Sequence, residues 1–383
     1  MPRLPPILSF DAATFMEHAS MMSREHILTR LAKETVVLHS TPPLGRNITA
    51  PKRGMVEASQ NLYHYTNPGY LPRLYRSAVG ERFFSRLRSL HRRYLLSTLG
   101  QTDIKPILYI WHPEFVDEIG RYGECMVVYH IYDDYPNLPG ASDNLVAKEL
   151  EILNVADIVF GANQSLIDAR KKIVARDYIH LPQGVDFQLF QEASQLGELP
   201  KIDIEEISGP RVGYIGRVNK KVDLALVHAI AKRRPEWNFT FVGPVDSDPE
   251  LALDLDRIRQ LKNVYFLGPK PFKDVPRYWM ALDVAIIPYR HEPGQWAFFG
   301  SPLKLQESFA AGKGVVISPL NETKAYENLI RVAEGENAWI DAIDALIKEK
   351  GDASKEKARI EFASGNSWES RVERIKREIL DRL

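Results

Sequence analysis

Cysteine is nearly absent from this 383-residue sequence, which has Cys125 and no other. No disulfide can form within the chain, and one thiol without neighbouring ligands cannot hold a structural zinc. No hydrophobic run approaches the roughly 20 residues of a membrane span, and the N-terminal run Ile7 to Phe10 is too short for a signal peptide. We therefore expect a protein of the reducing cytoplasm.

The sequence also lacks an excess of charge of either sign, because 50 basic residues balance 50 acidic ones. The whole molecule therefore has no electrostatic reason to bind nucleic acid, and none is expected as a partner. A hydrophobic fraction of 44% with 26% charged residues is ordinary for a folded globular chain. Any partner attracted by charge must meet a local patch.

Strand-like and helix-like segments alternate along the chain, which predicts βαβ units, and therefore mostly parallel sheets with helices on both faces. The length exceeds what one hydrophobic core usually organises, so two domains are expected. We predict Rossmann-like, doubly wound α/β domains at residues 1–190 and 208–363, with a polar linker near 190–208. The pattern is irregular between residues 41 and 106. In the second half the predicted strands are 211–215, 239–242, 264–267, 284–288 and 315–318.

A helix with recognisable ends is predicted over residues 302–311. Ser301 suits the cap position, Pro302 the first helical position, and Gly312 the left-handed residue past the end. Lys304 then lies in the first turn, where the helix dipole is already positive and a lysine is unfavourable. A broken local rule of this kind often marks a functional site.

An anion at this helix start would explain Lys304. The backbone N–H groups near Ser301 and Leu303, the helix dipole and the ammonium group would all act on one diphosphate. Glu307 lies one turn further on the same face, and its carboxylate could accept the two ribose hydroxyls of a nucleotide. The alternative is an ordinary solvated lysine and glutamate pair on a helix.

A second candidate phosphate site is the segment 213–221, which follows a predicted strand and opens a helix. Gly216 lies in the turn, and Arg217 with Lys220 or Lys221 could reach phosphate oxygens. The segment lacks the third glycine of a dinucleotide fingerprint, which disfavours a nicotinamide enzyme. A basic, solvated helix start is the alternative.

Acidic pairs suggest a base and, less strongly, a metal site. Asp133 and Asp134 follow a predicted strand, 126–132, and a carboxylate there could act as general base toward an acceptor hydroxyl. The alternative is that one caps a turn and the other is solvated. Asp246 and Asp248 form an aspartate-x-aspartate pair, but Asp248 precedes Pro249 and is expected to cap a helix. We predict no metal site.

A basic segment at residues 72–93 interleaves arginines with aromatic residues. It would fit peripheral contact with anionic lipid. Single-stranded nucleic acid could also use such arginines and aromatic rings, and an ordinary helix with solvated arginines is the remaining alternative. Its arginines, opposed by the single acid Glu81, are Arg73, Arg76, Arg82, Arg86, Arg88, Arg92 and Arg93.

The second half resembles the nucleotide-sugar domain of GT-B glycosyltransferases, particularly group 1 or family-4-like bacterial enzymes of surface-polysaccharide synthesis. The resemblance rests on the segments 213–217, 237–244, 263–269, 282–288 and 301–312. In the first half, 156–160 and 181–186 are similar to the family's last N-domain elements. The resemblance implies two domains facing across a cleft, with an acceptor-binding first domain and a C-terminal helix, 364–383, crossing back to it.

The resemblance also implies roles for single residues. Arg217 and Lys304 resemble the diphosphate ligands and Glu307 the ribose ligand. Lys270 lies in the loop that corresponds to the one that reads the base, and Asp133 resembles the base of some inverting members. Retaining members often carry a glutamate where this chain has Phe299, so the sugar-contact role of that acid is unsupported.

The expected function is transfer of a hexose-type sugar from a UDP- or GDP-sugar to a saccharide acceptor, expected to be lipid-linked, in polysaccharide or glycoconjugate synthesis. No metal or other cofactor is expected to be required. The expected location is the cytoplasm, with peripheral attachment to the inner face of the plasma membrane. Two alternatives remain, a catalytically inactive nucleotide-sugar-binding regulatory protein and a nucleotide-sugar epimerase of the same architecture.

Overall fold

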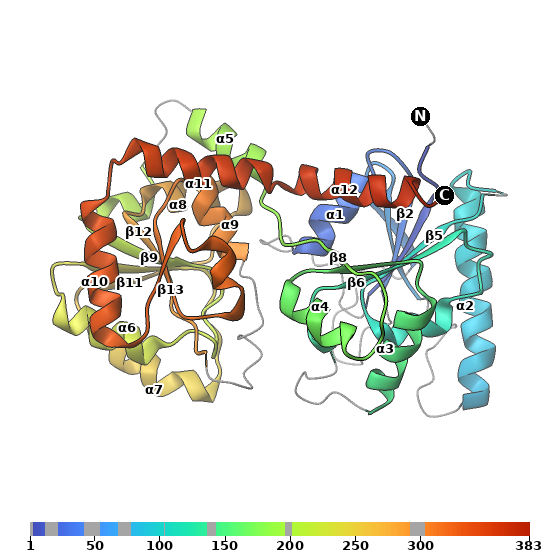
Figure 1. The fold of residues 1–383 in the computed structure, drawn as a ribbon, viewed down its shortest axis with the longest axis horizontal. Helices are drawn as coiled ribbons and strands as arrows, with labels where there is room; N and C mark the ends of the chain where they lie inside the picture. Colours follow the sequence, from blue (N-terminus) through green and yellow to red (C-terminus); the bar gives the residue numbers. More distant parts are fainter. Residues whose placement is uncertain are drawn as a thin grey trace. The chain divides into compact units, whose positions relative to one another are not determined.

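The chain folds into two compact α/β units, which confirms the predicted fold class. The computed structural model describes residues 3–11, 22–41, 54–67, 78–102, 104–135, 143–195, 201–291 and 303–383. The first unit consists of residues 1–182 with 371–383, and the second of residues 183–370 (Figure 1).

The first unit is built on an eight-stranded sheet in the order β3-β4-β2-β1-β5-β6-β7-β8. All neighbouring strands in it are parallel except β3 and β4, which pair antiparallel at the edge. The strands are β1 (Ile7–Phe10), β2 (Val37–Thr41), β3 (Gly54–Ser59), β4 (Leu62–Thr66), β5 (Ile107–Ile110), β6 (Met126–Ile131), β7 (Ile158–Gly161) and β8 (Ile179–His180).

Helices cover this sheet and bury one continuous apolar face. Leu8, Phe10 and Leu38 on the strands pack with Leu96 of α2 and Ile152 of α3 in a single core cluster. The helices of the unit are α1 (Ser23–Leu31), α2 (Ala78–Thr98), the short 3-10 helix η1 (Pro113–Glu118), α3 (Asp143–Val155) and α4 (Gln164–Lys171). Most of α12 (Trp368–Leu380) also belongs to this unit.

The second unit contains six parallel strands in the order β11-β10-β9-β12-β13-β14. The chain begins in the middle of the sheet at β9, builds outward through β10 and β11, and then returns to the other side of β9 with β12. The carboxyl ends of β9 and β12 therefore form a topological switch point, where open α/β sheets bind ligands. The strands are β9 (Arg211–Ile215), β10 (Asn238–Val242), β11 (Val264–Gly268), β12 (Val284–Ile287), β13 (Val315–Ile317) and β14 (Ile330–Val332).

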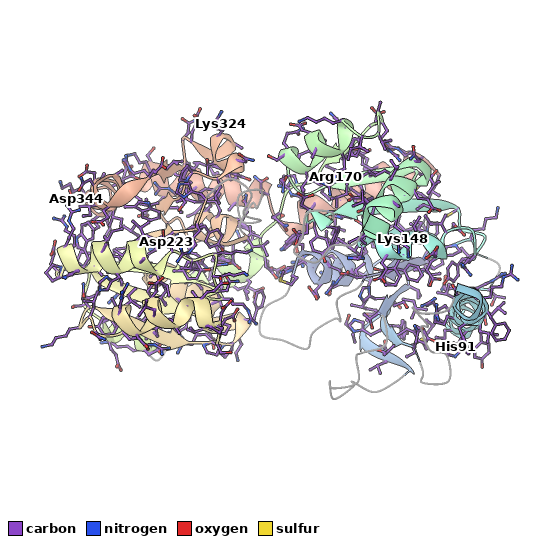
Figure 2. The ribbon with its side chains drawn as sticks, turned by 90° about the horizontal axis from the view of Figure 1, so that it is seen from below. His91, Lys148, Arg170, Asp223, Lys324 and Asp344 are labelled. Atoms are coloured by element: carbon purple, nitrogen blue, oxygen red, sulfur yellow. The ribbon has the colours of Figure 1, made fainter. Side chains whose placement is uncertain are left out.

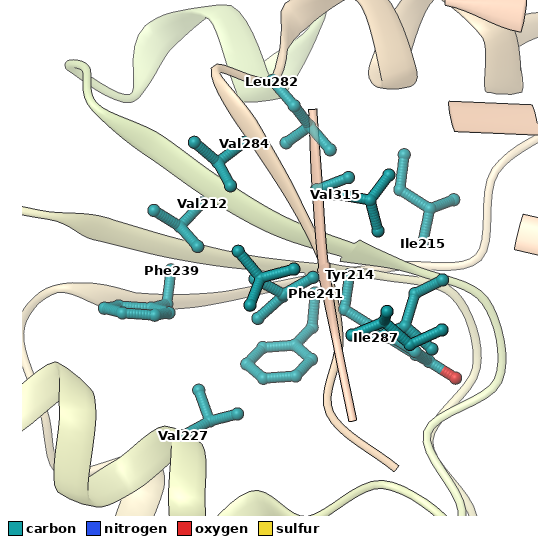
Figure 3. Packing of buried hydrophobic residues seen from close by; sticks show 14 of the residues in the cluster. Val212, Tyr214, Ile215, Val227, Phe239, Phe241, Leu282, Val284, Ile287 and Val315 are labelled. Atoms are coloured by element: carbon teal, nitrogen blue, oxygen red, sulfur yellow. The ribbon is translucent and has the colours of Figure 1, made fainter. Parts of the chain in front are cut away.

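The core of the second unit lies on both faces of this sheet (Figure 3). Strands buried on both faces read as continuous apolar runs, as in Val284–Ile287. Helices α6 and α7 lie on one side of the sheet, and α8, α9 and α11 on the other (Figure 1). The helices are α5 (Phe187–Gln195), α6 (Leu224–Arg233), α7 (Pro249–Ile258), α8 (Val275–Ala281), α9 (Leu303–Ala310), α10 (Gly335–Lys348) and α11 (Ala353–Gly365).

The segment expected to be a polar linker carries structure of its own. Phe190 on α5 and Ile204 on the 3-10 helix η3 (Asp203–Glu206) are buried in the core of the second unit. These few apolar side chains are enough to dock the segment, although its composition is polar. Within the described ranges, no helix has the length and apolar character needed to cross a membrane.

Candidate active site

Two glycines shape the turns at the carboxyl ends of β9 and β10. Gly216 has φ +139° and its N–H donates to the Val242 carbonyl at 2.7 Å. Gly243 has φ +137°, and a Cβ placed on it would lie 2.3 Å from the Gly216 carbonyl oxygen. The two backbones touch directly between the ends of β9 and β10, so neither position accepts a side chain without strain.

Lys304, in the first turn of α9, lies directly over the Gly216 turn. A Cβ on Gly216 would lie 2.1 Å from the Lys304 Cε and 2.7 Å from its Nζ. The ammonium group faces two aromatic rings, at 5.3 Å from the Tyr214 centroid and 5.9 Å from the Tyr289 centroid. Tyr214 belongs to β9 and Tyr289 follows β12, so both edges of the switch point hold the lysine through cation–π contacts.

The charge of Lys304 is not neutralised by an ion pair within the part of the chain that the structure describes. Glu307, three residues further along α9, is the acidic residue on the same side of the helix. Burial raises the pKa of its carboxyl, and the positive charge of Lys304 and the indole of Trp279 act in the opposite direction. The site therefore places the Lys304 ammonium, which contacts two aromatic rings, near the half-buried Glu307 carboxyl.

Of Arg217 and the two lysines that follow β9, all described residues, only Lys221 contacts a ring that also contacts Lys304. The Arg217 side chain is 60% exposed and pairs with Asp246 at 2.7 Å. Lys221 places its ammonium 6.0 Å from the centroid of the same Tyr289 ring. Lys220 is exposed to solvent. The structure thus brings Gly216, Lys221 and Lys304 to one place and leaves Arg217 within a surface ion pair.

Lys270 lies in the loop for which the resemblance implied base contacts by the backbone, and its side chain has partners within the second unit. Its ammonium forms an ion pair with Asp203 of η3 and lies 5.3 Å from the Tyr278 ring centroid. The Tyr278 hydroxyl donates to the same aspartate at 2.7 Å. The described contacts of Lys270 are therefore with η3 and α8, not with α9.

Two further positions, Ser301 and Leu303, are expected from the sequence at the start of α9. Leu303 is its first residue, which agrees with a helix beginning just before Lys304. Ser301 lies outside the described residues, as does the loop with Phe299.

The two acids after β6 have separate partners. The Asp133 carboxylate accepts the backbone N–H of Asp134 at 2.9 Å. Asp134 itself pairs with Arg170 at 2.6 Å, and Arg170 also holds Glu149 at 3.1 Å. Asp134 is thus part of an ion-pair network that joins β6 to α3 and α4, whereas the Asp133 carboxylate accepts the backbone N–H of the next residue.

The aspartate-x-aspartate pair is structural, as predicted for its second member. Asp248 caps α7 and accepts the Glu250 N–H at 2.9 Å. Asp246 is the partner of Arg217. Among the described residues, no three His, Cys, Asp or Glu side chains gather as a metal site would require.

Two histidines near strand ends have structural contacts. His130 is buried, shares a hydrogen bond of 2.9 Å with the Tyr109 hydroxyl, and stacks on Trp111. Burial lowers its pKa to about 3. His112 accepts the Glu114 N–H at 3.2 Å and caps η1.

The two tyrosine rings that contact Lys304 were not identified from the sequence. Tyr214, Tyr289 and Gly243 lie on three different strand ends, and only the sheet order brings them to α9. The one local signal is a tyrosine directly after the Ile287-Pro288 strand end. Such a position faces the ligand edge of a parallel sheet.

The prediction that the arginines of residues 72–93 are solvated, or accessible to lipid, is wrong for two of them. Arg88 and Arg92 are buried. Arg92 donates to Glu118 at 3.1 Å, to the Tyr122 hydroxyl at 3.1 Å and to Ser40 at 3.0 Å. A buried carboxylate compensates this charge, a pairing that the local sequence does not show.

Comparisons with known proteins place this chain among glycosyltransferase-like proteins. The family model "Glycosyl transferases group 1" matches residues 209–349, which include the Gly216 turn and all of α9. A curated relative from Bacillus subtilis (strain 168), TuaH, which carries the name of a teichuronic acid biosynthesis glycosyltransferase, is 30% identical over 227 residues. That match covers 57% of this chain and 56% of the relative, so the chain spans little more than half of the relative's length.

Solved structures match the whole chain at low identity. Sucrose-phosphate synthase from Thermosynechococcus elongatus has a TM-score of 0.69 at 16% identity and covers 98% of both chains. HepE from Anabaena, in complex with UDP, has a TM-score of 0.70 at 14% identity and covers 99% of this chain and 100% of its own. The same Anabaena protein was also solved with UDP-glucose. The two α/β units therefore have the fold of the GT-B glycosyltransferases, and residues 209–349 of the second unit match the group 1 glycosyl transferase model.

Proposed function

We propose that this protein is a glycosyltransferase that moves a sugar from a nucleotide diphosphate-sugar, with UDP or GDP as the nucleotide, to a saccharide acceptor. The observation that carries the proposal is the Lys304 ammonium, which lies over the Gly216 turn at the switch point and forms no ion pair among the described residues. The family match over this segment, and the UDP and UDP-glucose bound to a protein of the same fold, support a nucleotide sugar as the ligand.

Lys304 would act on the leaving group. As the bond from the anomeric carbon to the diphosphate oxygen breaks, negative charge builds on the diphosphate. A donor that is already in position stabilises that charge without reorganisation. Lys304 and the N–H groups at the start of α9 provide such donors. Glu307, one turn on, would accept hydrogen bonds from the ribose hydroxyls.

Arg217 would join the diphosphate after leaving Asp246. An exposed ion pair contributes only about 0 to 1 kcal/mol, so exchanging a carboxylate for a phosphate costs little. Asp133, on the first unit, would accept the proton of the acceptor hydroxyl as that oxygen bonds to the anomeric carbon. The protein groups named here supply charge and proton transfer without a bound ion, so we propose that the reaction requires no metal.

We propose that the acceptor is a lipid-linked saccharide and that the reaction takes place at the cytoplasmic face of the plasma membrane. The support is the match to a relative that is named for teichuronic acid biosynthesis. The acceptor's sugar would meet the first unit, where Asp133 lies at the carboxyl end of β6.

A thermal-shift screen against UDP, GDP, ADP and their sugars tests the donor site, since a specific ligand raises the apparent stability by mass action. We expect one nucleotide class to stabilise the wild type and to lose that effect in Lys304→Ala. The matched control is Lys232→Ala, an exposed lysine in the last turn of α6. An equal shift in both variants would remove Lys304 from the donor site.

Transfer assays then separate the reactions. Labelled sugar that appears on a saccharide acceptor, with activity unchanged by a chelator, would support the proposal. Donor binding without transfer across an acceptor panel would indicate a regulatory protein, and turnover of the donor alone would indicate an epimerase. Strict dependence on manganese would contradict the metal-free site.

A further inference from the structure

The outer face of α2 carries large apolar side chains in solvent. Phe83, Leu90 and Tyr94 are 59%, 58% and 63% exposed. Their spacings of seven and four residues place them along one side of a helix that turns every 3.6 residues. Figure 1 shows α2 as a long helix at the edge of the first unit. Single exposed apolar residues are ordinary, but three aligned on one face are not.

The charges on this face are all positive. Arg86 and Arg93 each lie three residues after an exposed apolar residue, and both are exposed. From Phe83 to Thr98 the sequence has no aspartate or glutamate. We name Phe83, Arg86, Leu90, Arg93 and Tyr94 the outer stripe of α2.

Contacts made by the other side of α2 hold the helix in an orientation that leaves the outer stripe in solvent. Arg92 lies over the Phe10 and Tyr65 rings, at 5.2 and 5.7 Å, and binds Glu118 within the first unit. His91, labelled in Figure 2, shares a 2.7 Å hydrogen bond with the Tyr65 hydroxyl. Turning the helix to hide the stripe would break the ion pair and leave Glu118 buried without its partner.

We propose that the outer stripe of α2 docks the protein on an anionic lipid bilayer. A helix with an apolar side bordered by basic residues lies in the plane of the membrane interface, with its apolar side chains among the headgroups. The two arginines would pair with lipid phosphates, and the Tyr94 ring suits the boundary between apolar and wet regions. The absence of acids in the described stripe favours lipid over a protein partner, whose surface usually carries both signs.

This inference deepens the proposed function, because it rests on a lipid-linked acceptor as the reason for docking. It also corrects the sequence-based view of the segment. The lipid-facing cations are Arg86 and Arg93, whereas Arg88 and Arg92 are buried in the fold. The apolar contribution of Phe83, Leu90 and Tyr94 should matter as much as the charge.

Vesicle flotation of the full chain tests the inference. We expect the wild type to float with phosphatidylcholine vesicles that contain phosphatidylglycerol, to float less in high salt, and to stay in solution with phosphatidylcholine alone. Phe83→Ser/Leu90→Ser/Tyr94→Ser should lose at least ten-fold in bound fraction at limiting lipid. Arg86→Gln/Arg93→Gln should lose the dependence on anionic lipid. The matched control is Leu253→Ser/Ile173→Ser, at two residues of similar exposure on other elements.

Two further readouts keep the outcomes distinct. The nucleotide thermal shift and transfer to a lipid-free acceptor should be unchanged in the stripe variants, so that lost docking is separated from lost folding or chemistry. A wild type that does not bind anionic vesicles, or stripe variants that bind as well as the wild type, would overturn the inference. It would also be overturned by a wild-type dimer that the stripe variants convert to a monomer, because the stripe would then meet a second copy of the chain.

Discussion

Replacing Gly216 with alanine should weaken nucleotide binding through Lys304. The new methyl group would lie 2.1 Å from the Lys304 Cε, whereas carbon atoms rest at about 3.5 to 4.0 Å. The lysine tip must therefore move by about 1.4 to 1.9 Å, away from the position between Tyr214 and Tyr289. The backbone adds a second cost, because φ +139° is a region that alanine rarely adopts.

The size of the effect follows from the contact that is lost. A hydrogen bond to a charged group contributes about 1.5 to 3 kcal/mol, which corresponds to about ten- to 150-fold in the dissociation constant. A displacement of about 1 Å at a functional group can cost a factor of about 100. We therefore expect Gly216→Ala to weaken binding of the selected nucleoside diphosphate by about ten- to 100-fold.

Isothermal titration in a double-mutant cycle isolates the cause. Gly216→Ala should weaken binding strongly in the wild type and little in a Lys304→Ala background, since the displaced group is then gone. Gly54→Ala is the control for positive φ, because Gly54 has φ +107° and nothing lies within 4 Å of the position that its new methyl group would take. An equal loss of affinity in both backgrounds would refute the claim that Lys304 carries the effect.

Three other predictions rest on single contacts. Tyr289→Leu should weaken diphosphate binding by up to about 30-fold, the upper size of a desolvated cation–π contact. Tyr289→Phe keeps the ring and should bind diphosphate as the wild type does. If titration calorimetry shows an equal loss of affinity in both variants, the hydroxyl and not the ring is responsible. Arg92→Met should lower the free energy of unfolding by about 3 to 5 kcal/mol because Glu118 stays buried and unpaired, and Arg92→Met/Glu118→Leu should recover part of it in urea titrations. Burial holds the pKa of His26 and of His130 at about 3, against 6.5 in the unfolded chain. Protonation therefore favours the unfolded chain, so the free energy of unfolding falls as the pH drops from 6.5 toward 3, by at most about 2 kcal/mol for each histidine at pH 5. An equal free energy of unfolding at pH 7.5 and pH 5, measured by urea titration, would contradict this.

The strands of both units can be predicted from the sequence, except β3 and β4 of the first unit, which lie in the irregular segment 41–106, and β14 of the second unit. Strands β9 to β13 are apolar runs between turn residues, and each run can be recognised from a short stretch of sequence alone. Strand β3, at the edge of the first sheet, exposes most of its side chains and shows no such pattern. Strand β14 has only three residues, Ile330–Val332. The sequence predicts neither of them, because edge strands bury too little to leave a periodic signal.

The candidate site divides in the same way. Lys304, Glu307 and Gly216 can be recognised from their neighbours in the sequence. A lysine in the first turn of a helix breaks a local preference, and a glycine directly after a strand matches a known phosphate-binding pattern. The partners that decide the chemistry of other charges are remote in sequence. Lys270 meets Asp203 across 67 residues, and Arg92 meets Glu118 across 26. The sequence alone suggests that such charges face solvent or ligand, and these two face a carboxylate of their own chain.

Arg217 and Lys304 should differ in the step that each controls. Lys304 is already held between two rings, so its interaction with the diphosphate is ready when charge develops, and its loss should lower kcat. Arg217 is exposed and must leave Asp246 first, so its contact forms on binding and contributes equally before and during the reaction. Arg217→Ala should therefore raise KM with little change in kcat, and Asp246→Asn should lower KM by freeing the guanidinium. Steady-state kinetics that show a larger fall in kcat for Arg217→Ala than for Lys304→Ala would reverse this assignment.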